Sequence, residues 1–195
     1  FWLDEKRNLI VYHGQPGVLT QYIHDLVVLS PTYFAVPNRL QCLQVLAWYR
    51  WPVPMAMTDD NYDWPIEPGM TPLPHQKIYA NFTALHPRMF NLGDPGTMKT
   101  LSTLWAADFL MKQFPPGTTR ALIVAPLTIL DTVWAAGIFR ILVGRRTFKI
   151  LTGDETKRTK LLAEEADFYI INSDGLKVGA RARPKRELRG FNIHT

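Results

Sequence analysis

The residues best suited to chemistry in this chain lie between Gly93 and Thr100, where two glycines precede a Lys-Thr pair. Backbone N–H groups at a helix start, a lysine ammonium and a small hydroxyl are the groups that hold the phosphates and Mg²⁺ of a nucleoside triphosphate. The usual spacing is G-x-x-x-x-G-K-[ST], and here Met98 stands where the second glycine is expected. Its side chain is expected to crowd the backbone or to resist a dihedral that glycine adopts freely.

We predict the following roles for this candidate phosphate loop. Lys99 neutralises the β- and γ-phosphates of ATP, and Thr100 is a ligand of Mg²⁺. A carboxylate at Asp94 would repel a triphosphate unless it points outward, so Asp94-Pro95 is interpreted as turn chemistry. The alternatives are a chance glycine-rich turn and a surface lysine at a helix start. The residues predicted to bind the cofactor in the loop are Gly93, Asp94, Pro95, Gly96, Thr97, Met98, Lys99 and Thr100.

Short apolar strands alternate with helices around this loop. Strands are predicted at 89–92, 121–125, 148–151 and 168–171, and helices at 75–85, 98–113, 129–140 and 155–165. Such a pattern predicts an α/β domain with a parallel sheet covered by helices on both faces. Ligands bind at the carboxyl ends of the strands in such sheets. We therefore expect the turns at Gly93, Pro126, Thr152 and Asn172 to share one edge of the sheet.

The first 74 residues have a different pattern. Strands are predicted at 8–13, 26–29 and 33–36 and a helix over 39–49, which makes residues 1–50 a small α+β appendage. Residues 51–74 contain six prolines and are predicted to be a linker packed by its aromatic side chains. Residues 75–195 then form the α/β domain.

Charge and composition narrow the function classes. The net charge is +5, but residues 1–70 hold four Lys and Arg against seven Asp and Glu, so the basic character lies in the second part. The run from Lys177 to Arg189 contains a single acidic residue, and it indicates either a polyanion contact or a solvated loop. No apolar stretch approaches the roughly 20 residues that span a bilayer, and the start is unlike a signal peptide. We expect a cytoplasmic protein without a membrane partner.

The few metal-binding and redox residues indicate no further site. The single cysteine, Cys42, excludes an internal disulfide and is interpreted as a core residue. The five histidines show no ligand spacing, so no zinc site is expected. Trp134 lies on an apolar helix face and is interpreted as core in preference to a base-stacking platform.

Taken in order, the turns resemble the motifs of one family. They are similar to the first RecA-like domain of superfamily-two DNA helicases and translocases, most closely the Swi/Snf-type group with its bacterial and phage members. The resemblance covers residues 70–195. The matching segments are 72–76 for the Q-type motif, 93–100 for motif I, 121–130 with Trp134 for motif Ia, 151–153 for motif Ib, and 169–176 for a segment that reads I-I-N-x-D/E-G-L in this group.

The resemblance assigns roles to residues outside the loop. It implies that Gln76 reads the adenine, and that the turns at Pro126, Thr128 and Gly153 lie against phosphates of one DNA strand. Asn172 either contacts DNA or caps a turn. The plainer alternatives are a helix-surface glutamine at 76 and ordinary strand-end turns at the other positions.

As a whole, the resemblance implies the N-terminal part of an ATP-dependent DNA helicase or translocase that uses ATP and Mg²⁺ and grips duplex or single-stranded DNA. The acidic motif II is expected from about Ile193, and the second RecA-like domain of the parent chain would bring the arginine finger. Residues 1–195 alone are therefore expected to bind nucleotide weakly and to hydrolyse it negligibly.

Two other functions stay open. The first is a non-catalytic nucleic-acid-binding or assembly module that retains a RecA-like fold. A weaker alternative is a P-loop kinase, which leaves the segments at 151–153 and 169–176 unexplained.

Overall fold

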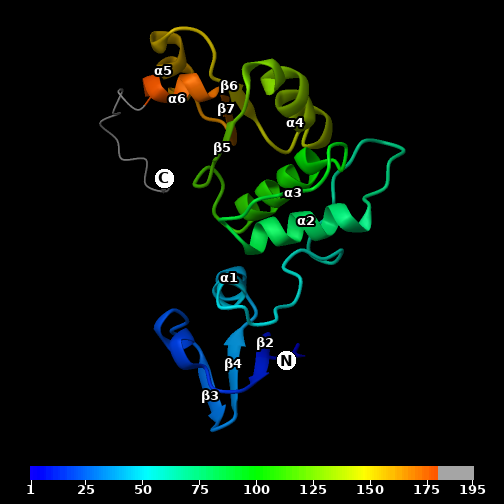
Figure 1. The fold of residues 1–195 in the computed structure, drawn as a ribbon, viewed down its shortest axis with the longest axis vertical. Helices are drawn as coiled ribbons and strands as arrows, with labels where there is room; N and C mark the ends of the chain where they lie inside the picture. The colour runs from blue at the N-terminus through cyan, green and yellow to red at the C-terminus, as the bar shows by residue number, and fades with distance from the viewer. Residues whose placement is uncertain (180–195) are drawn as a thin grey trace.

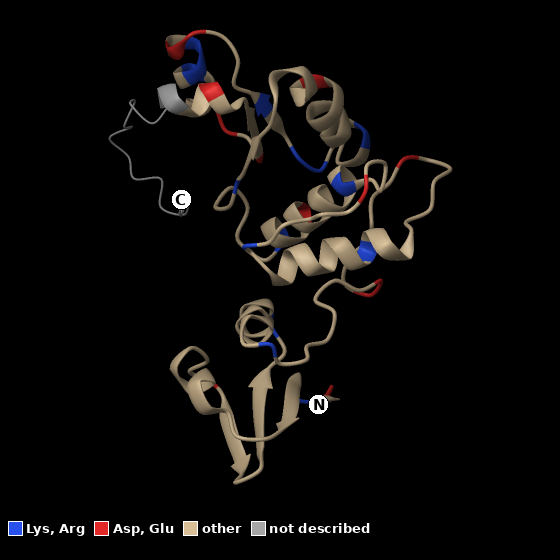
Figure 2. Ribbon diagram, in the orientation of Figure 1, with Lys and Arg blue, Asp and Glu red and all other residues tan. Residues whose placement is uncertain are grey.

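The computed structural model describes residues 1–179. A central pair of helices has one sheet on each side (Figure 1). The first sheet is antiparallel, with the strand order β1-β2-β4-β3. Its strands and the helices near them are β1 (Trp2–Asp4), β2 (Leu9–His13), the 3-10 helix η1 (Gly17–Gln21), β3 (Val27–Ser30), β4 (Tyr33–Pro37) and α1 (Leu40–Trp48). Strands β2, β3 and β4 carry no Lys, Arg, Asp or Glu (Figure 2).

The central pair consists of α2 (Pro74–Leu85) and α3 (Lys99–Lys112). Residues 51–73 have no helix or strand, but they are packed: the Trp64 and Trp105 rings meet edge to face at 5.2 Å, and the Trp105 indole N–H donates to the Pro65 carbonyl at 2.6 Å. One continuous hydrophobic core therefore runs from the antiparallel sheet through residues 56–66 to α2 and α3.

The second sheet is parallel, with the order β5-β7-β6. Phe168 and Ile170 of the central strand pack with α3 and α4, whereas Tyr169 and Ile171 pack on the opposite face with α5 and α6. The predicted parallel sheet with helices on both faces is thus confirmed as a mixed α/β structure. Its elements are β5 (Ala121–Val124), the 3-10 helix η2 (Leu127–Ile129), the π-helix η3 (Leu130–Ala135), α4 (Ala136–Ile141), β6 (Phe148–Ile150), α5 (Glu155–Ala163), β7 (Phe168–Ile171) and α6 (Ser173–Gly179).

The strand predicted at 89–92 is wrong. This segment has no regular secondary structure, and the side chains of Phe90 and Leu92 are each 90% exposed. A short, mostly apolar run becomes a strand only where a sheet edge accepts its N–H and C=O groups. Here the backbone bends at 87–88 and turns again at Pro95, so the apolar composition alone was misleading.

The single helix predicted over 129–140 is also wrong, because the chain forms η2, η3 and α4 in succession. Leu130 and Ala135 are both buried, five residues apart. Residues at this spacing fall on different faces of an α-helix, and the wider π-turn brings them to the same face.

Two other predictions fall at the end of the chain. The basic run from Lys177 to Arg189 lies almost wholly outside the described residues, as does the strand expected near Ile193. No helix within residues 1–179 is long and apolar enough to cross a bilayer.

A buried carboxylate, Asp108 of α3, ties this helix to the parallel sheet and to the segment before α2. It accepts hydrogen bonds from Arg146 Nε at 2.7 Å, Arg145 Nη1 at 3.0 Å and the Tyr62 hydroxyl at 3.0 Å. Arg146 also pairs with Asp167, next to β7, at 3.2 Å. Two guanidinium groups and a hydroxyl therefore offset the cost of burying this charge.

The same network lowers or raises the pKa of its neighbours. Hydrogen bonds from Arg145 hold the pKa of the Asp63 carboxyl well below its usual range. Burial, together with the Asp108 charge, raises the pKa of Tyr62 well above its usual value, so this phenol stays protonated and donates.

We predict that Asp108→Asn lowers the free energy of unfolding by about 3 kcal/mol, because it leaves two partly buried arginines without their common partner. Asp25→Asn is the matched control, since Asp25 pairs with Arg39 in an exposed ion pair, and it should cost less than about 1 kcal/mol. Urea denaturation measures both. Equal, small losses in the two variants would contradict a stabilising role for the buried network.

Candidate nucleotide-binding site

The candidate phosphate loop is closed by a type II turn over residues 94–97. The Thr97 N–H donates to the Asp94 carbonyl at 3.3 Å, and the Thr97 hydroxyl donates to the same oxygen at 2.8 Å. Gly96 has φ +85°, the left-handed value that position i+2 of this turn requires, and Pro95 supplies the fixed φ of position i+1. The sequence Asp-Pro-Gly-Thr thus determines the shape of the loop, in agreement with the interpretation of Asp94-Pro95 as turn chemistry.

Lys99 is the first residue of α3, and its side chain folds back over the loop. Its ammonium donates to the Gly93 carbonyl at 2.5 Å and to the Asp94 carbonyl at 3.0 Å. These acceptors are neutral, whereas a phosphate oxygen is anionic and would also attract the ammonium by its charge. The loop therefore holds the lysine where a bound phosphate could take over its hydrogen bonds.

The N-terminus of α3 is available to an anion. No side chain caps this end of the helix. The Ser102 N–H donates to the Met98 carbonyl at 3.3 Å, and the three N–H groups before it are those that a helix start leaves without an intrahelical partner. They also carry the positive end of the helix dipole. Thr100 is the second residue of α3 and is half-buried, with its methyl group near Gly137 of α4.

Met98 adopts the conformation that glycine favours. Its φ of 55° and ψ of 41° are left-handed, and only four residues other than glycine have positive φ among residues 1–179. The side chain is 44% exposed, so it is not crowded by the loop. Its sulfur accepts a hydrogen bond from the Gln76 amide nitrogen at 3.1 Å. Methionine at this position thus takes the left-handed backbone conformation and adds a contact to α2.

Gln76 is 1% exposed, so the alternative of a helix-surface glutamine is wrong. Its amide oxygen accepts from the Leu73 N–H at 3.0 Å, which caps the start of α2, and its amide nitrogen is bonded to Met98. The structure places Gln76 beside the candidate phosphate loop, with both ends of the amide hydrogen-bonded to protein. The contact with adenine stays a prediction, and it requires Met98 to move.

Three of the four predicted turns share an edge of the parallel sheet. The register pairs Val124 with Ile171 and Ile150 with Ile170, so the strands end side by side. The turns that follow contain Pro126, Thr152 and Asn172. The expectation that Gly93 follows a fourth strand of this sheet is wrong, because residues 89–92 form no strand.

The residues predicted to contact DNA differ in their exposure and in their hydrogen bonds. Pro126 is exposed just before η2, Thr128 is exposed within η2, and Gly153 is exposed with φ +100°. The Asn172 side chain accepts from the Gly175 N–H at 3.2 Å, so it caps the start of α6. Of the two roles considered for Asn172, the structure shows the cap. Trp134 packs against the core of the sheet.

Sequence reasoning missed two groups of residues. One is the charge network of Asp108, whose members are far apart in the chain and carry no local signal. The other is a cavity beside α1, for which the run Trp48-Tyr49-Arg50 at a helix end was an available signal. Within residues 1–179 no three His, Cys, Asp or Glu side chains are grouped so as to hold a metal ion.

No protein-family model matches the sequence, and a search of curated proteins finds no significant match. The residues and geometry of the loop therefore carry the functional argument by themselves.

We predict that the free energy of unfolding, measured by urea denaturation, is about 1 kcal/mol higher for Met98→Gly than for Met98→Ala. Both variants lose the contact with Gln76, but only glycine adopts the left-handed dihedrals without cost. Met70 provides the matched control, because it is similarly exposed and its φ is not positive. There, alanine should be at least as stable as glycine. If alanine were equal to or better than glycine at position 98, the inferred strain would be absent.

Proposed function

We propose that this chain contains the ATP-binding domain of a DNA-dependent motor of the helicase or translocase type, with a RecA-like arrangement of its parallel sheet. One observation carries the proposal. The type II turn at 94–97 brings the Lys99 ammonium and the uncapped start of α3 together at one loop, and both are groups that bind phosphate.

The side chains of the loop have separable roles in binding ATP. Lys99 would exchange its hydrogen bonds with the Gly93 and Asp94 carbonyls for bonds to the β- and γ-phosphates. The backbone N–H groups at the start of α3 would donate to the same phosphates. The Thr100 hydroxyl would hold Mg²⁺, which neutralises charge on the phosphates when it is bound.

The turns at the edge of the parallel sheet support the DNA-binding part of the proposal. The exposed backbone at Pro126, Thr128 and Gly153 would lie against phosphates of one strand, a contact that positions DNA without reading its sequence. Asn172 would act indirectly, by fixing the start of α6.

Packing suggests how the two sites would be coupled. Leu104 of α3 lies in the same buried cluster as Phe168 and Ile170 of β7, the central strand of the sheet. A movement of α3 on nucleotide binding would therefore be transmitted to the strands that carry the DNA-contacting turns.

The non-catalytic nucleic-acid-binding module is the second candidate, and one observation favours it. Lys99 and Gln76, the two side chains expected to hold the nucleotide, are both hydrogen-bonded to the protein itself. A loop locked in this state would keep the fold and not bind ATP.

Calorimetric titration with Mg²⁺ and ATP separates the two candidates. We predict weak but measurable binding by the parent chain and a loss of about tenfold or more in Lys99→Ala, because a charge-assisted contact to the phosphates is removed. Lys160→Ala, an exposed lysine of α5, is the control and should bind as the parent does. Absence of binding by a folded parent chain would contradict the ATPase proposal and favour the module.

A further inference from the structure

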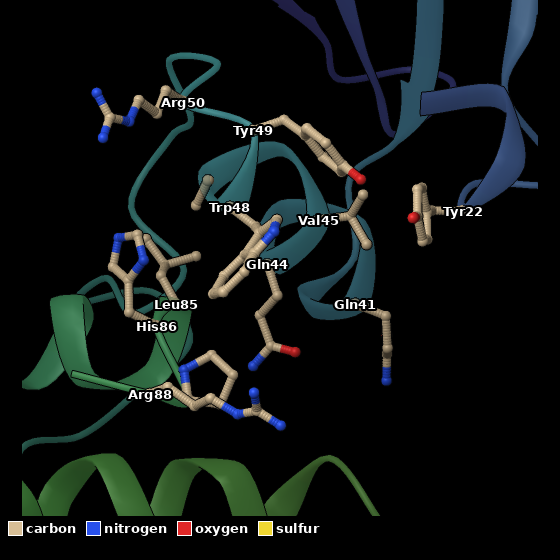
Figure 3. A pocket seen from close by; sticks show the side chains of 12 residues that line it. Tyr22, Gln41, Gln44, Val45, Trp48, Tyr49, Arg50, Leu85, His86 and Arg88 are labelled. Carbon is tan, nitrogen blue, oxygen red and sulfur yellow. The ribbon is translucent and has the colours of Figure 1, made fainter. Parts of the chain in front are cut away.

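A cavity of about 610 Å³ lies between α1 and the end of α2, on the side of α2 away from the parallel sheet (Figures 1 and 3). It is walled by one side of α1 with the two residues that follow it, by Tyr22 and by residues 85–88. The volume is within the range of small-molecule and nucleotide sites. None of the turns proposed to contact DNA lines it.

The walls of the cavity are held in place by the fold. The Gln44 side chain of α1 donates to the Ala84 carbonyl of α2 at 2.8 Å, so the two helices are joined directly. Arg50, with a left-handed φ of 60°, follows the end of α1, and the next N–H, of Trp51, returns to the Leu46 carbonyl at 2.9 Å. The position of the residues around the cavity is thus determined before any ligand binds.

An exposed indole is the main feature of the cavity. Trp48 is 64% exposed, although it belongs to a helix whose other face is buried in the core. Figure 3 shows its ring in the middle of the cavity wall, between the side chains of His86 and Gln44. No ring or cation within residues 1–179 stacks on it, whereas the nearby Tyr22 and Tyr49 rings contact each other, with their centres 5.5 Å apart and their planes tilted by 43°. An open aromatic face of this kind is a stacking surface for a nucleobase.

The charges around the indole are of one sign. Arg50 and Arg88 line the cavity, no acidic residue does, and neither arginine forms an ion pair within the described residues. In Figure 3 the two arginines lie on opposite sides of Trp48. A nucleotide within a strand has a phosphate on each side of its base, whereas a free mononucleotide carries its charge at one end. Guanidinium groups bind such phosphates and also stack on bases.

We infer that this cavity binds single-stranded DNA, with a base stacked on Trp48 and the flanking phosphates bound by Arg50 and Arg88. The site is separate from the phosphate loop and from the sheet-edge turns. Where it rests on the proposed function, it gives the N-terminal part of the chain a function of its own, the binding of an unpaired strand while the α/β part acts on DNA.

Fluorescence anisotropy with a labelled twelve-thymidine oligonucleotide tests the inference, without nucleotide and at low salt. Trp48→Ala should weaken binding by about fivefold or more, as loss of one base–aromatic stack does. Arg88→Ala should also weaken binding, and it should reduce the dependence of affinity on salt. Trp2→Ala and Arg7→Ala are the matched controls, because both residues are exposed and lie away from the cavity, and they should bind as the parent chain does.

Two further ligands identify what is recognised. An abasic oligomer of the same length should bind more weakly than the thymidine oligomer and should not distinguish Trp48→Ala from the parent. Thymidine monophosphate should compete poorly. Affinity in Trp48→Ala within twofold of the parent, or equal binding of the abasic oligomer, would overturn the stacking site, and efficient competition by the mononucleotide would overturn a strand site.

The Trp48 cavity and the phosphate loop can be tested separately. Lys99→Ala should leave oligonucleotide binding in the absence of ATP unchanged, and Trp48→Ala should leave ATP binding unchanged. If the parent chain binds the oligonucleotide but not ATP, the motor is contradicted and the cavity is not. If it binds ATP but Trp48→Ala does not weaken oligonucleotide binding, the stacking site is contradicted and the motor is not.

Discussion

The burial of one charge, the Asp108 carboxylate, determines how the α/β part is arranged. α3 must lie against the parallel sheet for its first turn to hold the candidate phosphate loop in place, yet no strand connects the loop to that sheet. Asp108, in the second half of α3, forms hydrogen bonds with Arg145 and Arg146 in the segment before β6. A buried carboxylate with two guanidinium partners is directional as well as strong, so it sets the position of α3 along the sheet in a way that apolar packing alone does not.

At the start of α3, the loop combines a fixed backbone with exchangeable side-chain contacts. The type II turn at 94–97 and the left-handed Met98 fix the path of the chain, and neither needs a ligand to form. The bonds of Lys99 to two carbonyls and of Gln76 to the Met98 sulfur are the exchangeable part. The methionine therefore links the loop to α2 through a contact that a glycine could not make.

The strands of the parallel sheet could be predicted from the sequence. A strand that is buried on both faces has a continuously apolar sequence, as residues 168–171 do. The absence of a strand at 89–92 could not be predicted. Whether these residues form a strand depends on a free sheet edge beside them, which no local sequence pattern reveals. In the site, the type II turn followed from Asp-Pro-Gly-Thr, but the burial of Gln76 and its bond to Met98 did not, because they arise from the packing of α2 on α3. The cavity at Trp48 was missed for the same reason: its walls come from α1, Tyr22 and the end of α2, which only the tertiary structure brings together.

In the proposed mechanism of binding, residues 93–100 form a phosphate site whose lysine rests on the loop's own carbonyls until an anion replaces them. Hydrogen exchange of the backbone amides across the loop and the first turn of α3, measured with and without saturating Mg²⁺ and ATP, is the decisive test. We expect slower exchange at residues 96–101 on addition of nucleotide, with no change in the antiparallel sheet. Unchanged exchange at these amides under saturating nucleotide would contradict the proposed phosphate site.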